Sequence, residues 1–141
     1  MIHMVKLCVG VSSVEELEGY RDERAHWWGA NYGEDVHVHR TRTMPKRKDE
    51  MEGLSSIYWV IAGQVVCRQP IIRLAKFTTA EGIDYCDIIM APDMVRTVPY
   101  PKRPFQGWRY LPAGDAPPDL GANENAESLA LAADLAKLGL I

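Results

Sequence analysis

The stretch that decides the fold is Ile57-Tyr58-Trp59-Val60-Ile61, followed by the turn Ala62-Gly63 and the long run 64–77. Aromatic and β-branched residues dominate the first run, which makes it the strongest strand candidate in the chain. The two-residue connection to the next run predicts an antiparallel hairpin. Pro70 interrupts the second run and, because proline cannot donate to a strand ladder, marks an edge, a bulge or a bend. We therefore predict a sheet that turns a corner near Pro70 and begins to close.

Shorter strands are predicted on both sides of this hairpin. Residues 2–9 are rich in Val, Leu and Ile, and residues 36–43 alternate with a period of two. That period puts one set of side chains on one face and a second set on the other: Val36, Val38, Arg40 and Arg42 against His37, His39, Thr41 and Thr43. The remaining strand candidates are residues 85–90, 94–98 and 105–111, with a stiff loop framed by Pro99, Pro101 and Pro104.

Helices are predicted near the two ends of the chain. Ser12 and Ser13 each precede a glutamate by three positions, which is the capping-box pattern of a helix start. This helix is predicted to run to about Trp28 and to be broken by Gly29 and Gly33. The charged residues 46–52 fit a short helix. After a surface linker at 112–125, apolar residues at helical spacing predict an amphipathic helix over 126–138.

Strands at short intervals, with helices at the ends, argue for the α+β class rather than a doubly wound parallel sheet. We predict a small, strongly curved or barrel-like mixed sheet with an N-terminal helix and a C-terminal helix. Residues 1–121 are expected to form a single α+β domain, and residues 122–141 a helix packed on it or extending from it. One domain also suits a chain of 141 residues.

The composition is that of a globular protein, with 47% hydrophobic and 25% charged residues. No window approaches the roughly 18 apolar residues of a membrane span. The N-terminus lacks the charged region that opens a secretory signal. Cys8, Cys67 and Cys86 are odd in number and widely spaced, which fits reduced thiols better than a disulfide framework. We therefore expect a cytoplasmic protein that does not contact a membrane.

The net charge of -3 conceals a strong segregation of charge along the chain. Residues 1–35 carry 3 basic and 7 acidic side chains, and residues 110–141 carry 1 basic and 5 acidic. The middle segment, 36–109, carries 12 basic and 7 acidic side chains. Such an excess can build a positive patch on an acidic protein, although an uneven surface distribution explains it equally well.

The basic middle segment contains the candidate ligand-binding residues. Arginine forks match phosphate oxygens, lysines add charge, and exposed rings stack on bases at roughly 1–3 kcal/mol each. The set consists of Arg40, Arg42, Lys46, Arg47, Arg68, Arg103, Trp108 and Arg109. Surface ion pairs for the arginines and core packing for Trp108 are the alternatives. We predict a binding module for RNA, another nucleic acid or a nucleotide, with Tyr110 as a second stacking ring and no cofactor.

Two other classes of function remain open. His37 and His39 share a strand face and are candidate metal ligands, but no third ligand is indicated by spacing. A small hydrolase-type enzyme on a nucleotide-like or anionic substrate would use His37, His39 or Cys67. Cys67 in an apolar strand is also typical of a small buried hydrophobe. The third prediction is a protein-interaction adaptor that docks a partner through the terminal helix.

Five segments are distinctive: residues 41–47, 56–63, 68–69, 103–110 and 115–120. Together they resemble a bacterial family catalogued as a domain of unknown function, family 1489, over nearly the whole chain except the terminal helix. The resemblance implies a bacterial, cytoplasmic, single-domain protein and no particular activity. One departure is Leu54-Ser55-Ser56, where a glycine pair is expected before the serine. The order of strand, basic loop and bent hairpin is also similar to PUA-like and ASCH-type small barrels, which implies RNA or modified-nucleotide binding.

Overall fold

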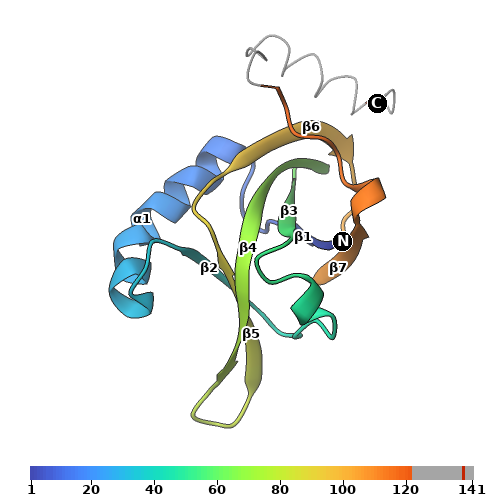
Figure 1. Cartoon of the computed structure of the whole chain (residues 1–141). Helices are drawn as coiled ribbons and strands as arrows, with labels where there is room; N and C mark the ends of the chain where they lie inside the picture. Colours follow the sequence, from blue (N-terminus) through green and yellow to red (C-terminus); the bar gives the residue numbers. More distant parts are fainter. Residues whose placement is uncertain (122–137, 139–141) are drawn as a thin grey trace.

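Strand β4 (Gln64–Thr78) organises the sheet, and it bends where the sequence predicts. In the computed structural model, which describes residues 1–121 and residue 138, its first half pairs with β3 (Ser56–Ile61) as far as Pro70. From Ile71 onward it pairs with β5 (Asp84–Met90), and a bulge follows at once between Ile71 and Arg73. Pro70 therefore marks the point at which β4 changes partner. Figure 1 shows β4 running through the middle of the molecule into the projecting β4–β5 hairpin.

The remaining elements complete one mixed sheet of seven strands with the order β2-β5-β4-β3-β1-β7 and with β6 on β4. Among the strands of residues 1–121, only β1 and β3 run parallel; the other pairs are antiparallel. The bounds of these elements are β1 Ile2–Leu7, α1 Val14–Tyr32, β2 His37–Thr41, β6 Val95–Pro101 and β7 Trp108–Pro112, with 3₁₀ turns at Lys48–Glu50 and Ala113–Asp115.

The sheet is open, but side chains bring its two ends together. The indole Nε1 of Trp108 on β7 donates to the carbonyl oxygen of Thr43, just after β2, at 2.9 Å. The backbone N–H of Arg47 in turn donates to the hydroxyl of Tyr110 at 3.2 Å. Helix α1 lies beside β2 along one side of the sheet (Figure 1). Two hydrogen bonds thus connect β7, at one end of the sheet, with the segment that follows β2 at the other end.

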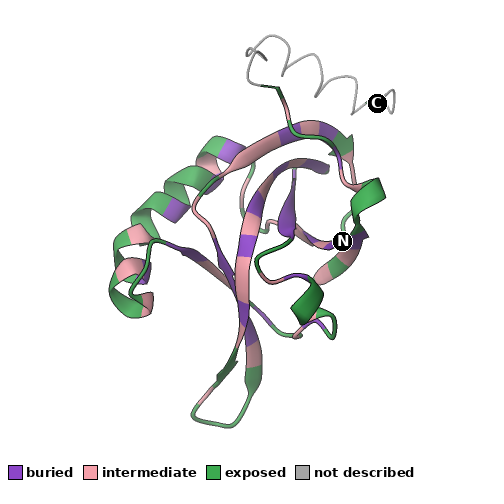
Figure 2. Ribbon diagram, viewed as in Figure 1, coloured by how far each residue is buried: buried purple, intermediate pink, exposed green. Residues whose placement is uncertain are grey.

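The core lies between the inner face of the sheet and α1. Trp59, Met4 and Ile88 are fully buried in its main cluster. Burying a side chain of this size contributes roughly 1.5–3 kcal/mol, so such residues dominate the stability of the sheet. Figure 2 shows the buried stripe of α1, with exposed residues on its outer side and at the tip of the β4–β5 hairpin. No described helix is long and apolar enough to cross a membrane.

Several boundaries differ from the sequence prediction. Helix α1 does not break at Gly29 but continues to Tyr32, because Gly33 supplies the left-handed cap at φ 71° and donates to the carbonyl of Gly29. Ser13 caps its N-terminus, as predicted, by accepting from the N–H of Glu16. The predicted helix over 46–52 shrinks to one 3₁₀ turn, and β6 extends through Pro99 and Pro101 at an edge of the sheet. The predicted C-terminal helix lies outside the described residues.

The β3–β4 turn carries a residue whose backbone conformation is unfavourable. Ala62 has φ 52° and is the only described non-glycine residue with positive φ, while Gly63 follows at φ 80°. A residue with a Cβ pays roughly 1–2 kcal/mol in this region, which asparagine tolerates better. Ala62 is exposed, so packing does not offset the strain.

We predict that Ala62→Asn raises the free energy of unfolding by about 1 kcal/mol, because it relieves the turn without changing the core. Urea unfolding measures the difference. Gly63→Ala is the matched control and should lower stability, although its Cβ would meet no atom within 4 Å. Equal stability of the three proteins would show that the turn carries no conformational strain.

Candidate anion-binding site

Three of the six predicted ligand-binding arginines are already neutralised. The three pairs, each with its shortest N···O distance at 2.6–2.8 Å, are Arg40 with Asp87, Arg47 with Glu50 and Arg68 with Asp119. Arg40 also stacks on the ring of Phe77, with its guanidinium carbon 3.7 Å from the ring centroid. Arg68 holds the pKa of Asp119 below its ordinary value through a side-chain hydrogen bond. These three arginines have partners on the protein and offer little free charge.

The other predicted residues do not meet on one face. Trp108 and Tyr110 point to one side of β7, and Arg109 between them points to the other, where it lies over Phe105 at 5.5 Å. Arg42 donates to the carbonyl oxygen of Asp84. Lys46 and Arg103 are exposed, and neither forms an ion pair with a described carboxylate. The geometry therefore brings Trp108 and Tyr110 to the loop that carries Lys46 and Arg47, and leaves Arg103 and Arg109 elsewhere.

A different cluster of cations surrounds a cavity between β1, β2 and α1. The cavity has a volume of about 260 Å³, and its cationic lining comes from Lys6 on β1 and from Arg21 and Arg24 on α1. His39 of β2 closes one wall, and apolar residues such as Leu17 complete it. No aspartate or glutamate lines this cavity, which we call the Arg21 cavity. Its lining carries three formal positive charges and no negative one.

Arg21 is the unusual residue of this cavity. Its side chain is 7% exposed, and its Nε atom is enclosed without a hydrogen-bond partner. One NH group reaches the carbonyl oxygen of Val38 at 3.5 Å, the upper limit of a hydrogen bond. The guanidinium carbon lies 5.2 Å from the ring centroid of Trp59 and 5.9 Å from that of Trp28. A buried arginine is therefore held by two rings and one weak hydrogen bond, with no described carboxylate as partner.

Four ionisable groups that line the cavity have pKa values shifted mainly by burial. Burial lowers the pKa of Arg21 and of Lys6 from their ordinary values. The pKa of His39 falls to about 4, first through burial and then through Lys6 and Arg21, so this imidazole is neutral at pH 7. Burial raises the pKa of the Cys8 thiol in the same lining. Burial is the largest cause of all four pKa shifts and disfavours the charged form of each group; only at His39 do neighbouring cations shift the pKa in the same direction.

The sequence prediction missed Arg21, although a signal for it exists. The buried residues of α1 are Val14, Leu17, Arg21 and Trp28, which lie three, four and seven positions apart. That spacing defines the inner stripe of a helix. An arginine at an otherwise apolar position of the stripe has its guanidinium directed into the interior. The spacing of the apolar residues in α1 therefore predicts a buried side chain at position 21.

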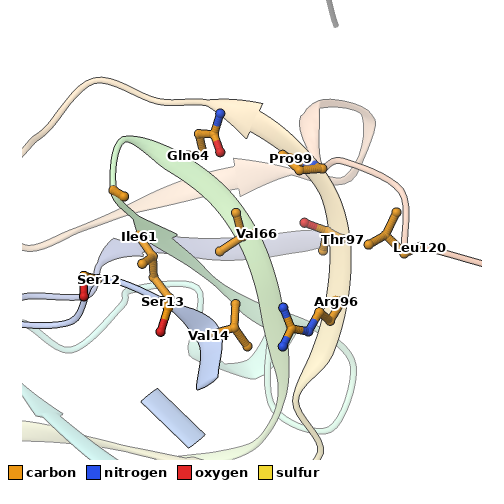
Figure 3. Close-up of a pocket in the computed structure, with 11 residues that line it drawn as sticks. Ser12, Ser13, Val14, Ile61, Gln64, Val66, Arg96, Thr97, Pro99 and Leu120 are labelled. Carbon is orange, nitrogen blue, oxygen red and sulfur yellow. The ribbon is translucent and has the colours of Figure 1, made fainter. Parts of the chain in front are cut away.

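Two other cavities are less suited to an anion. Figure 3 shows one of about 250 Å³ between the start of α1, the β3–β4 turn and β6, with Arg96 in its wall. Arg96 is already paired there with Glu15 at 2.7 Å and with Glu18 at 3.5 Å. A larger cavity of about 530 Å³ between β6 and β7 has a mainly apolar, proline-rich lining with one lysine and one aspartate. Neither has an unpaired buried charge.

The histidines and the cysteine proposed for metal binding or catalysis face the interior. His37 is buried, and its Nδ1 lies 2.9 Å from the side-chain nitrogen of Gln69. His39 meets the ring of Trp59 edge-on at 5.3 Å between centroids. Cys67 is fully buried, and burial raises its pKa to about 12, which leaves almost no thiolate at neutral pH. Among the described residues, no three His, Cys, Asp or Glu side chains form a group able to hold a metal ion.

The fold and the site define an α+β domain with an open, bent sheet and a cationic cavity under its helix. A family model described as a protein of unknown function (DUF1489) matches residues 4–141, and the chain belongs to this family. This confirms the resemblance seen in the sequence and extends it to the C-terminal segment. No curated protein and no solved structure matches the chain. The description of the family names no activity, so function has to be argued from the site.

The buried neutral His39 predicts a specific pH dependence of stability. Its pKa is 6.5 when unperturbed and about 4 in the folded protein, so between these values the unfolded chain binds more protons. The free energy of unfolding should therefore fall as the pH drops from 6.5 towards 4, by on the order of 2 kcal/mol. Urea unfolding at pH 7 and pH 4.5 measures this loss. His39→Gln should flatten this part of the profile, and an unchanged slope would contradict the assignment.

Proposed function

We propose that this protein is a binding module for a phosphate-bearing ligand of the nucleotide or RNA class, and that the anion binds in the Arg21 cavity. The observation that supports the proposal is the buried guanidinium of Arg21 with no carboxylate beside it. Lys6 and Arg24 add two further cations to the same lining, again without an acid. An anionic ligand is the missing partner of this charge.

The energy balance favours a missing anion over a purely structural arginine. Removing an ion from water costs several kcal/mol in a folded protein. A desolvated cation gains about 2 kcal/mol or more from an aromatic ring, but the Arg21 guanidinium carbon lies 5.2 and 5.9 Å from the two ring centroids, near the roughly 6 Å limit of such a contact. The bond to Val38 is also at the distance limit. A bound anion adds charge-assisted hydrogen bonds, which are stronger than these contacts, and neutralises the charge.

The charge of the cavity suits phosphate better than a single carboxylate. A phosphate carries one negative charge as a diester and about −1.5 to −2 as a monoester at pH 7, and it has more acceptor oxygens than a carboxylate. The three cations of the lining exceed either charge, so their donors can bond several phosphate oxygens at once. Arginine forks bind phosphate oxygens bidentately and lysine binds as a point charge, which is the combination present here.

The alternatives have less support. A hydrolase that uses Cys67 lacks a thiolate at neutral pH, and one that uses His37 or His39 lacks a nucleophile at either ring among the described contacts. The adaptor proposal depends on the C-terminal segment, outside the described residues. A barrel-like, PUA-like relationship and a location in a bacterial cytoplasm remain proposals. The three cysteines, none of them in a disulfide, are compatible with that location.

Arg21→Met tests the proposal, because methionine fills the space without the charge. Calorimetric titration with inorganic phosphate at low salt should give at least tenfold weaker binding for the variant than for the natural protein. The ligand-free variant should also be more stable by about 1–3 kcal/mol, since a buried unpaired charge is replaced by an apolar group.

Arg73→Met is the matched control, because Arg73 pairs with Glu34 at the surface, outside the Arg21 cavity. It should leave phosphate binding unchanged. The proposal fails if the natural protein does not bind phosphate, or if Arg21→Met binds as well as Arg73→Met. A loss of stability in Arg21→Met with unchanged binding would indicate that the arginine serves only the fold.

A further inference from the structure

Three side chains form one row across the sheet at the edge of the Arg21 cavity. Lys6 on β1 is the direct partner of Trp59 on β3 and, on its other side, of Trp108 on β7. Directly paired residues point to the same face, and neighbouring strands lie about 5 Å apart. The side chains of Trp59, Lys6 and Trp108 therefore lie in this order across three neighbouring strands, with Trp59 against Arg21 and Lys6 in the lining of the cavity.

Trp108 is held in a fixed orientation at the end of this row. Its Nε1 donates to Thr43, and its ring meets that of Tyr110 edge-on at 4.9 Å between centroids. The side chain is only partly buried, unlike Trp59, which is fully enclosed. A ring that is anchored but still partly accessible is a ready stacking platform, because binding costs it little conformational freedom.

The size of the cavity indicates that only part of the ligand enters it. Pockets that enclose a whole small molecule commonly measure about 300–1,000 Å³, and the Arg21 cavity measures about 260 Å³. A phosphate group and its nearest atoms fit, while a base and sugar extend outside. The remaining question is the direction in which they extend.

Two aromatic side chains mark two possible directions, and the charges distinguish them. Tyr20 lines the cavity on the α1 side, but its hydroxyl lies 3.4 Å from the carboxylate of Glu16, which repels a phosphodiester. On the Trp108 side, Lys6 lies next to the ring, and the loop bonded to it carries Lys46, which has no ion pair with a described carboxylate. A polyanion is therefore favoured in the direction of Trp108.

We propose that the ligand is a single-stranded nucleic acid, one phosphate of which occupies the Arg21 cavity while the adjacent base stacks on Trp108. This inference rests on the proposed function, since it requires a phosphate in that cavity. Lys6 contacts the backbone between the two positions, and Lys46 is available to the next phosphate. Stacking of this kind tolerates any base, so the protein would bind single strands without a strong preference for base sequence.

The test compares a tetranucleotide of adenylates with an abasic tetranucleotide of the same backbone, by fluorescence anisotropy at fixed salt. The natural protein should bind the adenylates about tenfold more tightly, which is the effect of one stacked base. Trp108→Leu should remove this preference. Trp108→Phe should keep most of it, because phenylalanine retains a ring for stacking. The small loss is expected because phenylalanine cannot donate the hydrogen bond to Thr43 that fixes the orientation of the ring. Tyr100→Leu is the matched control: Tyr100 is 50% exposed on β6 and does not line the cavity.

Binding of inorganic phosphate by each variant separates this inference from the function on which it rests. Normal phosphate binding by Trp108→Leu, together with loss of the adenylate preference, supports stacking and shows that the variant is folded. Equal binding of adenylate and abasic strands, or a preference that survives in Trp108→Leu, overturns the stacking inference alone. Failure of the natural protein to bind phosphate overturns both proposals.

Discussion

The Arg21 guanidinium lies against the rings of Trp59 and Trp28, and no described carboxylate neutralises it. The organisation of the site depends on this unbalanced charge. Together with burial and Lys6 it lowers the pKa of His39, and it adds to the positive charge of the cavity beneath α1 in a protein whose net charge is negative. An arginine in a protein is usually neutralised by an aspartate or glutamate, as is seen here for Arg40, Arg68 and Arg96. At Arg21 the chain keeps the charge unpaired, which is the arrangement expected of a binding site.

The bent sheet brings the required groups together. Because β4 changes partner at Pro70, β2 turns back towards β1 and β7 instead of extending away from them. Helix α1 covers the gap and delivers Arg21 and Arg24, while β1 supplies Lys6 and β2 supplies His39. Trp108 then joins the two ends of the sheet through Thr43. The same geometry that leaves the sheet open therefore forms a cationic cavity and places a tryptophan beside it.

Much of this fold is predictable from short-range signals. The hairpin around Ala62, the bend at Pro70 and the cap at Ser13 follow from turn, proline and capping chemistry, which act over a few residues. The C-terminal end of α1 is harder to predict from the sequence. Gly29 and Gly33 are both candidate helix breakers, and only Gly33, in its left-handed conformation, ends the helix. The charge runs misled the site prediction. Arg40 and Arg68 pair with acids that are distant in the sequence, Asp87 and Asp119, and a single sequence does not show such long-range contacts.

The most direct test of the account is the NMR signal of the Arg21 Nε–H group during a titration with inorganic phosphate. An enclosed Nε without a partner should be visible in the ligand-free protein and should shift progressively and saturably as phosphate binds, because a charge-assisted hydrogen bond forms nearby. The Nε–H signals of Arg68 and Arg73, which are paired with carboxylates, should remain in place. A titration that moves those surface signals and leaves Arg21 unchanged would contradict a phosphate site in the cavity.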